Sequence, residues 1–382
     1  MKILSIFGTR PEAIKMAPVV KLLAREKGIA SKVCVTAQHR QMLDQVLALF
    51  EIVPDIDLDV MTPGQDLFDI VSRSLMGLRN LLKHESPDLV LVQGDTTTTY
   101  TAALAAFYLK IPVGHIEAGL RTGNLYSPWP EEGNRLMTTC LTTLHFAPTE
   151  GSKENLLRSG VPAHSITVTG NTVIDALFLA ADLMRLNPPY IPSLPDFLQA
   201  NTIHHENAPR MVLITAHRRE NFGQGFLNIC NAIKKLALKF NNVHFVYPVH
   251  LNPNVQGPVF EILCNCNNIH LLEPQSYLPF VALMSRADLI LTDSGGIQEE
   301  APSLGKMVFV MRNTTERPEA IEAGTAKMIG TEEESIIQEV TVFLSQKRNC
   351  DIMVKKNNPY GDGHATERIL EAIKAHFGSI QK

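Results

Sequence analysis

TDSGGIQEEAPSLGKMVFVMRNTTER, residues 292–317, is the stretch of this chain that decides its fold. It follows the apolar run 287–291, which predicts a buried parallel strand, and its Asp-Ser-Gly-Gly turn precedes a helical pattern over 297–304. A strand, a turn and a helix start in this order direct the free backbone N–H groups from Ser294 onward at an anion. Gly295 and Gly296 would let a phosphate approach the backbone closely, because neither carries a side chain.

Two charged side chains near this turn are suited to a nucleotide. Glu300, one turn into the predicted helix, could accept hydrogen bonds from a pair of ribose hydroxyls. Arg317 lies in a loop after the next predicted strand, 307–311, and its guanidinium suits a diphosphate. A glycine turn alone is as often an ordinary helix start. The two charged residues at successive strand-to-helix edges favour a nucleotide site.

The composition is that of a globular protein with room for two domains. The chain has 382 residues, of which 45% are hydrophobic and 19% charged, and its net charge is −4. It carries no basic block, so nucleic acid is not an expected partner. No apolar run has the length of a membrane span and the first strand is too short for a signal peptide, so we expect no membrane association and a cytoplasmic location.

The six cysteines are scattered through apolar segments, which is typical of reduced, buried thiols. Cys264, Cys266 and His270 could be interpreted as zinc ligands. No second pair of ligands has a suitable spacing, so we expect no metal.

Predicted strands and helices alternate through both halves of the chain. Strands are expected at 2–7, 31–36, 89–92, 113–116, 145–148 and 166–168, and again at 211–214, 244–247, 269–271, 287–291 and 307–311. Repeated strand–helix units predict parallel sheets covered by helices on both faces. Segment 186–208 lacks periodicity and is expected to link the halves. The predicted fold class is α/β, with two Rossmann-like doubly wound domains facing one cleft.

Carboxylates and cations follow the predicted strands of the first half. Asp95 and Glu117 each lie in the turn that follows a predicted strand, and Glu131 begins a helix after a Ser-Pro-Trp-Pro loop. Arg10 and Lys15 lie at the first strand-to-helix turn. Ligands of such sheets bind at the carboxyl ends of the strands, so the three carboxylates are expected to converge. Each alone could be a helix cap or turn residue, but Asp95 and Glu117 both end strands of one sheet.

Polar and aromatic residues at strand ends of the second half are suited to a nucleotide diphosphate. His217, followed by two arginines, could donate to a phosphate oxygen, although a lone histidine is more often structural. Gln275 and Phe280 could contact a uracil through amide hydrogen bonds and ring packing. Phe280 alone would more often be a core residue.

A set of motifs in a fixed order carries a family resemblance over nearly the whole chain. The segments are GTRPEAIKMAP from Gly8, TAQHRQMLDQ from Thr36, GDTTTT from Gly94, HIEAGLRTG from His115, SPWPEEGNR from Ser127, GNTVIDAL from Gly170, TAHRREN from Thr215, SGGIQEEAPSLGK from Ser294, TTERPE from Thr314 and NPYGDG from Asn358. With these motifs the chain resembles the bacterial non-hydrolysing UDP-N-acetylglucosamine 2-epimerases.

The resemblance implies a fold of the GT-B type and reversible epimerisation at C2 of UDP-N-acetylglucosamine through anti elimination of UDP to 2-acetamidoglucal. It implies a homodimer and no metal or nicotinamide cofactor. Domain 1–172 would carry the catalytic carboxylates, domain 173–364 would bind UDP, and helix 365–382 would return to the first domain. Catalytic roles fall on Asp95, Glu117 and Glu131.

The resemblance also assigns two sets of ligand contacts. Contacts to the nucleotide sugar fall on Arg10, Lys15, Asp95, Glu117, His217, Gln275, Phe280, Ser294, Gly295, Gly296, Glu300 and Arg317. Some bacterial relatives bind a second UDP-N-acetylglucosamine as an activator, and the matching positions are Gln38, Gln41, Met42, Arg218 and His250. Three alternatives stay open: a hydrolysing epimerase, a GT-B glycosyltransferase that uses a UDP-sugar, and a non-catalytic UDP-sugar sensor.

Overall fold

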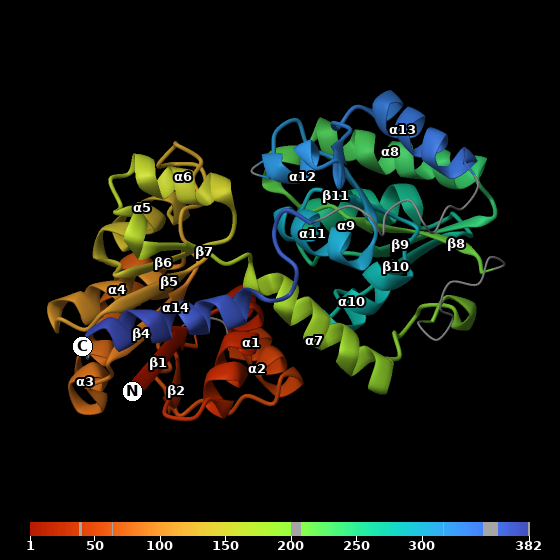
Figure 1. The fold of residues 1–382 in the computed structure, drawn as a ribbon. Coiled ribbons are helices and arrows are strands. Elements are labelled where there is room, and N and C mark those ends of the chain that lie inside the picture. Colours follow the sequence, from red (N-terminus) through yellow and green to blue (C-terminus); the bar gives the residue numbers. More distant parts are fainter. Residues whose placement is uncertain (38–39, 63, 200–207, 316, 347–357, 381–382) are drawn as a thin grey trace. The chain divides into compact units, whose positions relative to one another are not determined.

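The chain divides into two compact units, each built around its own sheet (Figure 1). The computed structural model describes residues 1–37, 40–62, 64–199, 208–315, 317–346 and 358–380. Unit 1 comprises Met1–Leu179 and Tyr360–Lys382, and unit 2 comprises Ala180–Pro359. The expected boundary at residue 172 differs from this division, which falls inside helix α7 (Thr172–Leu186).

Unit 1 contains a seven-stranded sheet in the order β3-β2-β1-β4-β5-β6-β7. All its paired strands are parallel. The strands are β1 (Lys2–Phe7), β2 (Ala30–Val35), β3 (Ile56–Asp57), β4 (Leu89–Gln93), β5 (Val113–Ile116), β6 (Leu144–Ala147) and β7 (Ile166–Val168). The strand order reverses between β1 and β4, which is the topological switch point where doubly wound sheets bind ligands.

Helices cover this sheet and connect its strands. Besides α7 they are α1 (Arg10–Arg25), α2 (Arg40–Leu49), α3 (Leu67–Glu85), α4 (Thr97–Tyr108), α5 (Glu131–Leu141), α6 (Glu150–Arg158) and α14 (Ala365–Ile380). The C-terminal helix α14, blue in Figure 1, belongs to the same unit as the N-terminus. Lys374 on α14 forms an ion pair of 2.8 Å with Glu26 at the end of α1.

Unit 2 contains a six-stranded parallel sheet in the order β10-β9-β8-β11-β12-β13. Its strands are β8 (Arg210–Thr215), β9 (Val243–Pro248), β10 (Ile269–Leu272), β11 (Leu289–Thr292), β12 (Met307–Val310) and β13 (Ala326–Met328). Its helices are α8 (Gln224–Lys239), α9 (Pro253–Leu263), α10 (Tyr277–Arg286), α11 (Gly295–Glu300), α12 (Pro318–Glu322) and α13 (Glu333–Ser345). The prediction of two Rossmann-like doubly wound sheets is confirmed.

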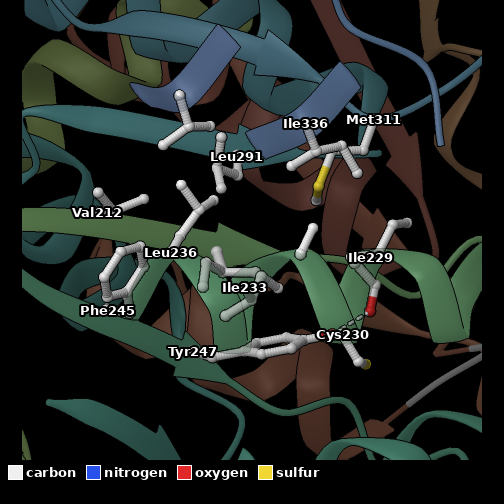
Figure 2. Close-up of a cluster of buried hydrophobic side chains, with 14 of the residues drawn as sticks. Val212, Ile229, Cys230, Ile233, Leu236, Phe245, Tyr247, Leu291, Met311 and Ile336 are labelled. Atoms are coloured by element: carbon white, nitrogen blue, oxygen red, sulfur yellow. Dashed lines mark hydrogen bonds between the residues drawn. The ribbon is translucent and has the colours of Figure 1, made fainter. Parts of the chain in front are cut away.

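A buried apolar layer joins α8 to the unit 2 sheet (Figure 2). Ile233 and Leu236 of α8 lie among side chains of β8, β9 and β11, including Val212, Phe245 and Leu291, and all five are fully buried. The α8 positions recur every three or four residues, as expected for a helix with one apolar face. This layer fixes the unit 2 strands whose carboxyl ends carry the candidate site.

Several elements differ from the prediction or were not assigned from the sequence. Helix α4 begins with Thr97, Thr98 and Thr99, which are buried. Helix α6 has only Ser152 and Leu156 buried, so the sequence shows no apolar stripe there. The expected helix 297–304 is split into α11 and a 3-10 segment, Ala301–Leu304. None of the described helices is long and apolar enough to cross a membrane.

Candidate active site

A buried carboxylate, Glu12, ties together the turns that follow β1 and β4. Its Oε2 accepts hydrogen bonds from the backbone N–H groups of Gly8 and Thr9 at 3.0 and 2.8 Å. Its Oε1 accepts from the hydroxyls of Thr96 and Thr99 at 2.6 and 3.1 Å. Burial raises the pKa of Glu12, against the lowering effect of these donors. Glu12 thereby holds together the two turns of the switch point. It was not among the predicted site residues, although its place three residues after Thr9 fits a capping box.

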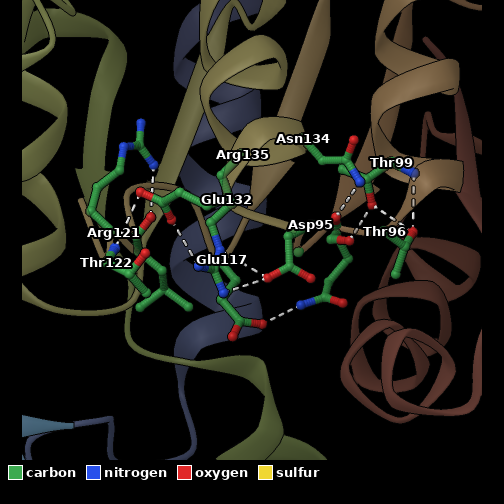
Figure 3. Close-up of polar contacts among 12 residues, drawn as sticks. Asp95, Thr96, Thr99, Glu117, Arg121, Thr122, Glu132, Asn134 and Arg135 are labelled. Carbon is green, nitrogen blue, oxygen red and sulfur yellow. Dashed lines mark hydrogen bonds and ion pairs between the residues drawn. The ribbon is translucent and has the colours of Figure 1, made fainter. Parts of the chain in front are cut away.

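Asp95, two residues after β4, is held by a buried arginine (Figure 3). Its Oδ2 accepts hydrogen bonds from Nε of Arg135 at 2.9 Å and lies 2.7 Å from Nη2 of the same guanidinium. The amide of Asn134 donates to the backbone carbonyl of Asp95 at 2.9 Å. The Asp95 side chain is 25% exposed, so it is fixed by α5 and still accessible.

Glu132, beside the predicted catalytic Glu131, completes this network. It is 1% exposed, and its Oε2 accepts from Nη1 of Arg135 at 3.0 Å. Its Oε1 accepts from the backbone N–H groups of Thr122 and Gly123 at 3.2 and 3.1 Å. Arg135 therefore joins two carboxylates, and Glu132 connects the loop after β5 to helix α5. Neither Glu132 nor Arg135 was among the site residues predicted from the sequence.

Glu117 follows β5, beside the strand that precedes Asp95. Gln93 and Ile116, the last residues of β4 and β5, are register partners. Oε2 of Glu117 accepts from Nζ of Lys15 at 2.5 Å and from the Gln93 amide. Glu117 has φ = +67°, in the left-handed region that costs a side-chain-bearing residue of order 1–3 kcal/mol. A glutamate held at such a position is a candidate for function.

Glu131 is the first residue of α5. Its Oε2 is buried and has no hydrogen-bond partner among the described residues. Because a buried carboxylate oxygen without a donor is costly, this atom is suited to a ligand group or water. The structure thus places Asp95 and Glu117 at neighbouring strand ends and Glu131 at the start of the helix that holds Asp95.

In unit 2, the turn after β11 is organised by Asp293, which is fully buried. Its Oδ2 accepts from the backbone N–H groups of His217 and Arg218 at 2.9 and 2.8 Å. The rings of His217 and His250 are stacked, with centroids 5.1 Å apart and planes at 9°. Burial lowers the pKa of His217, while the Asp293 charge opposes that shift.

Two guanidinium groups flank the backbone of Gly295. A Cβ placed on Gly295 would lie 3.6 Å from Nη2 of Arg218 and 3.9 Å from Nη2 of Arg317. Nε of Arg317 donates to Oε1 of Glu299, which is 1% exposed and anchors the guanidinium. Ser294 is the residue before α11. The predicted contacts at Ser294, Gly295 and Arg317 thus lie together at one turn flanked by two arginines.

The remaining predicted nucleotide contacts also lie in unit 2. Glu300 ends α11 and accepts from the hydroxyl of Tyr277 at 3.0 Å, and a Cβ on Gly296 would lie 3.7 Å from its Oε1. Gln275 precedes α10 and donates to the carbonyl of Glu273 at 2.7 Å. Phe280 on α10 is half-buried rather than a core residue.

The predicted activator positions fall in both units. Gln38 lies outside the described residues, as does the side chain of Gln41, while Met42 on α2 is 49% exposed. Arg218 and His250 in unit 2 lie against Gly295 and His217, respectively. The two predicted ligand sets therefore meet within unit 2.

His270, considered above as a zinc ligand with Cys264 and Cys266, instead contacts another histidine. Nε2 of His270 lies 3.0 Å from Nδ1 of His244, on the neighbouring strand β9. Among the described residues, no group of three or more histidine, cysteine or acidic side chains could hold a metal ion.

The two parallel, doubly wound sheets place the chain in the class of Rossmann-like α/β proteins. Comparison with known proteins specifies the family. Residues 21–374 match the family model described as UDP-N-acetylglucosamine 2-epimerase. The UDP-N-acetylglucosamine 2-epimerase of Yersinia pestis is 58% identical over 379 residues, which cover 98% of this chain and 99% of that protein.

Solved structures agree with this result. The UDP-GlcNAc 2-epimerase of Neisseria meningitidis, bound to UDP-GlcNAc, is 54% identical with a TM-score of 0.88 and covers 98% of this chain and 100% of its own. The glycosyltransferase of kitacinnamycin, at 11% identity and a TM-score of 0.63 over 98% of both chains, shares the GT-B-like fold alone. The chain belongs to the UDP-N-acetylglucosamine 2-epimerase family and is an isomerase.

Proposed function

We propose that this enzyme interconverts UDP-N-acetylglucosamine and UDP-N-acetylmannosamine without hydrolysis, by anti elimination of UDP to 2-acetamidoglucal and re-addition of UDP. The observation that carries this proposal is the carboxylate set of unit 1. Asp95 and Glu117 follow neighbouring parallel strands, and Glu131 begins the helix that holds Asp95. A site that only binds the nucleotide sugar would not need three carboxylates that can act as acids or bases.

The chemistry explains why several carboxylates are needed. The C2 hydrogen of the sugar has no neighbouring carbonyl to acidify it, so direct removal of the proton is very costly. If the C1–O bond breaks first, positive charge develops at C1 and the ring oxygen, and a carboxylate can stabilise it. The cation acidifies C2–H, a base removes the proton, and 2-acetamidoglucal and UDP result. Reprotonation from the opposite face and return of UDP invert C2, which calls for two differently placed acid/base groups.

In this proposal the cationic residues stabilise the leaving diphosphate. Arg10, His217 and Arg317 supply charge and hydrogen-bond donors where negative charge develops as UDP departs. The position of Arg317 beside Gly295 supports this role, because a phosphate could reach the backbone and the guanidinium together. Gln275 and Phe280 would contact the uracil, and Glu300 the ribose hydroxyls.

Asp95, Glu117 and Glu131 share the acid and base roles. Lys15 lies beside Glu117, so Glu117 suits a role as an ionised group. The Glu131 oxygen that lacks a partner among the described residues suits a group satisfied by the substrate. Asp95, anchored on one oxygen by Arg135, can present its carboxylate in a fixed direction.

The family resemblance extends the proposal to assembly and regulation. The enzyme would form a homodimer and bind a second UDP-N-acetylglucosamine as activator through Gln38, Gln41, Met42, Arg218 and His250. The stacking of His250 on His217 supports such a link. An activator that contacts His250 would therefore also affect His217, which is proposed to bind the diphosphate.

One experiment tests the reaction. UDP-N-acetylglucosamine labelled with ¹⁸O in the anomeric C1–O bond is incubated with enzyme in D₂O and followed by NMR and mass spectrometry. We expect UDP-N-acetylmannosamine with deuterium at C2 and with ¹⁸O spread from the bridging to the non-bridging positions, because free UDP must rotate before it returns.

The alternatives predict different products. Free N-acetylmannosamine would identify a hydrolysing enzyme, and turnover only in the presence of an acceptor would identify a glycosyltransferase. Tight binding without deuterium uptake would identify a sensor. UDP-N-acetylmannosamine formed in D₂O without deuterium at C2 would rule out the elimination route.

A further inference from the structure

The two oxygens of Asp293, at the end of β11, have different surroundings. Oδ2 accepts three hydrogen bonds, from the backbone N–H groups of His217 and Arg218 and from the Asn221 amide at 3.2 Å. Oδ1 is buried, has no hydrogen-bond partner among the described residues, and lies 3.8 Å from Nδ1 of His217. A buried acceptor left without a donor costs about 1–3 kcal/mol, so this arrangement calls for an explanation.

His217 has one edge toward Asp293 and an accessible side chain. Its side chain is 40% exposed, and its ring packs flat against His250. The charged and titratable groups that act on it are Asp293, His250 and Arg218. Because Nδ1 faces Asp293, Nε2 is the ring nitrogen left for a ligand.

We infer that Asp293 is a positioning residue, which accepts the Nδ1–H of His217 and holds the ring as an imidazolium whose Nε2–H donates to the substrate diphosphate. This inference rests on the diphosphate-binding role proposed for His217. No covalent bond forms or breaks: the imidazole takes one proton from water when the diphosphate binds and returns it when the diphosphate leaves. The distance of 3.8 Å would shorten in the complex, as hydrogen bonds of active sites often do when ligands bind.

The substitution Asp293→Asn gives a sharp test, because the structure dictates how the amide must lie. Two backbone N–H groups point at the Oδ2 position, so the amide oxygen has to remain there. The amide NH₂ then takes the Oδ1 position and faces Nδ1 of His217. It can donate to a neutral ring protonated on Nε2, but it cannot accept a proton held on Nδ1. The variant therefore removes the imidazolium while keeping the shape of the turn.

The measurement is ¹⁵N-histidine NMR of the full chain with and without UDP, with His217 assigned from a His217→Gln spectrum. In the wild type with UDP at neutral pH, we expect protons on both ring nitrogens of His217. In Asp293→Asn we expect a neutral ring protonated on Nε2 and a pKa lower than in the wild type, because the carboxylate charge that favours the imidazolium is gone. Asn221→Ala, which removes a donor to Oδ2 and keeps the carboxylate charge, should leave the His217 titration at its wild-type value.

Two results would overturn the inference. The first is the absence of a proton on Nδ1 of wild-type His217 when UDP is bound. This measurement does not require any variant to fold. The other is an unshifted His217 titration in folded Asp293→Asn. If the predicted shifts occur but His217→Gln turns over at the wild-type rate, the His217–Asp293 pair stands and the proposed role of His217 in the reaction fails.

Discussion

Arg135 holds a single oxygen of Asp95 with two nitrogens, Nε at 2.9 Å and Nη2 at 2.7 Å, while its Nη1 donates to Glu132 at 3.0 Å. The planar guanidinium presents donors on three nitrogens in a fixed geometry, which the single nitrogen of an ammonium group does not reproduce. Both Arg135 and Glu132 are buried, so this geometry is protected from water. The orientation of Asp95 therefore depends on a residue outside the predicted catalytic set.

Replacing Arg135 with lysine should lower kcat by roughly tenfold or more, about 1.4 kcal/mol, because lysine keeps the charge and loses the two-nitrogen contact. UDP affinity should stay close to wild type. Steady-state kinetics and calorimetry with UDP would measure both quantities. Arg158→Lys on α6, where the arginine is exposed and its Nη2 donates only to Asn155 in the described contacts, is the matched control. Equal kcat values in the two variants would contradict the positioning role.

Glu117→Gln should show whether the negative charge of Glu117, rather than its hydrogen bonds, is needed for turnover. The glutamine amide oxygen can still accept from Lys15 and Gln93, so the local contacts persist while the negative charge is lost. We expect kcat to fall by roughly 10²–10⁴-fold, the range for removal of an acid/base group. UDP lacks the sugar on which Glu117 would act, so its affinity should change little. Glu150→Gln on α6, at an exposed position, is the control; a Glu117→Gln enzyme as active as this control would remove Glu117 from the mechanism.

The sequence predicted where the strand ends would lie, because apolar runs mark buried parallel strands. Strand β1 and strand β5 were predicted with the observed bounds, and the residues after strand ends met at one edge of each sheet. What it could not predict were partners distant in the chain. Arg135 contacts Asp95 forty positions away, and the Glu12 bonds to Thr96 and Thr99 span 84 and 87 positions. Such contacts depend on packing, for which a single sequence carries no periodic signal.

Local helix and turn propensities also gave no guide to the structure where tertiary packing dominates. Local propensity does not favour a helix across the threonine run after Asp95, since β-branched residues are poor helix formers. In the structure Thr96 caps α4 by accepting from the Thr99 backbone, and the next threonines are buried against the sheet. Asp293 likewise reads as an ordinary residue before a glycine turn, and only the fold reveals the three donors on one of its oxygens.

Gly295→Ala should weaken UDP binding without unfolding the protein. The added Cβ would meet Arg218 and Arg317 at 3.6 and 3.9 Å, which is ordinary contact, so the melting temperature should be unchanged. The methyl group would occupy the space between the two guanidiniums that a phosphate needs. We expect UDP affinity to fall by about tenfold, or 1.4 kcal/mol, measured by calorimetry. Gly257→Ala in α9, where a Cβ meets nothing within 4 Å, is the matched control, and equal UDP affinities in both variants would place the phosphate elsewhere.

His115 should make the stability of unit 1 depend on pH. It is 1% exposed, its Nε2 lies 2.7 Å from the Gly94 carbonyl, and burial lowers its pKa from 6.5 to about 4, with smaller contributions from His145 and Arg121. Between these two values the unfolded chain holds a proton that the folded chain lacks. The free energy of unfolding must therefore fall as pH drops from 6.5 toward 4, by about 3 kcal/mol for this group. Above pH 6.5 the slope from this group fades, because the unfolded chain also loses its proton.

Urea unfolding followed by circular dichroism at several pH values would measure this dependence. Glutamine can keep a donor near Gly94 and does not titrate, so His115→Gln should flatten the curve between pH 6.5 and 4 by the contribution of one proton. His164→Gln, at an exposed position of the same unit, should leave the slope unchanged. A slope equally steep in both variants would mean that His115 does not stay neutral in the folded protein. Because His115 bonds to the residue directly before Asp95, its protonation would also disturb the turn that carries that carboxylate, and turnover should decline over the same pH range as stability.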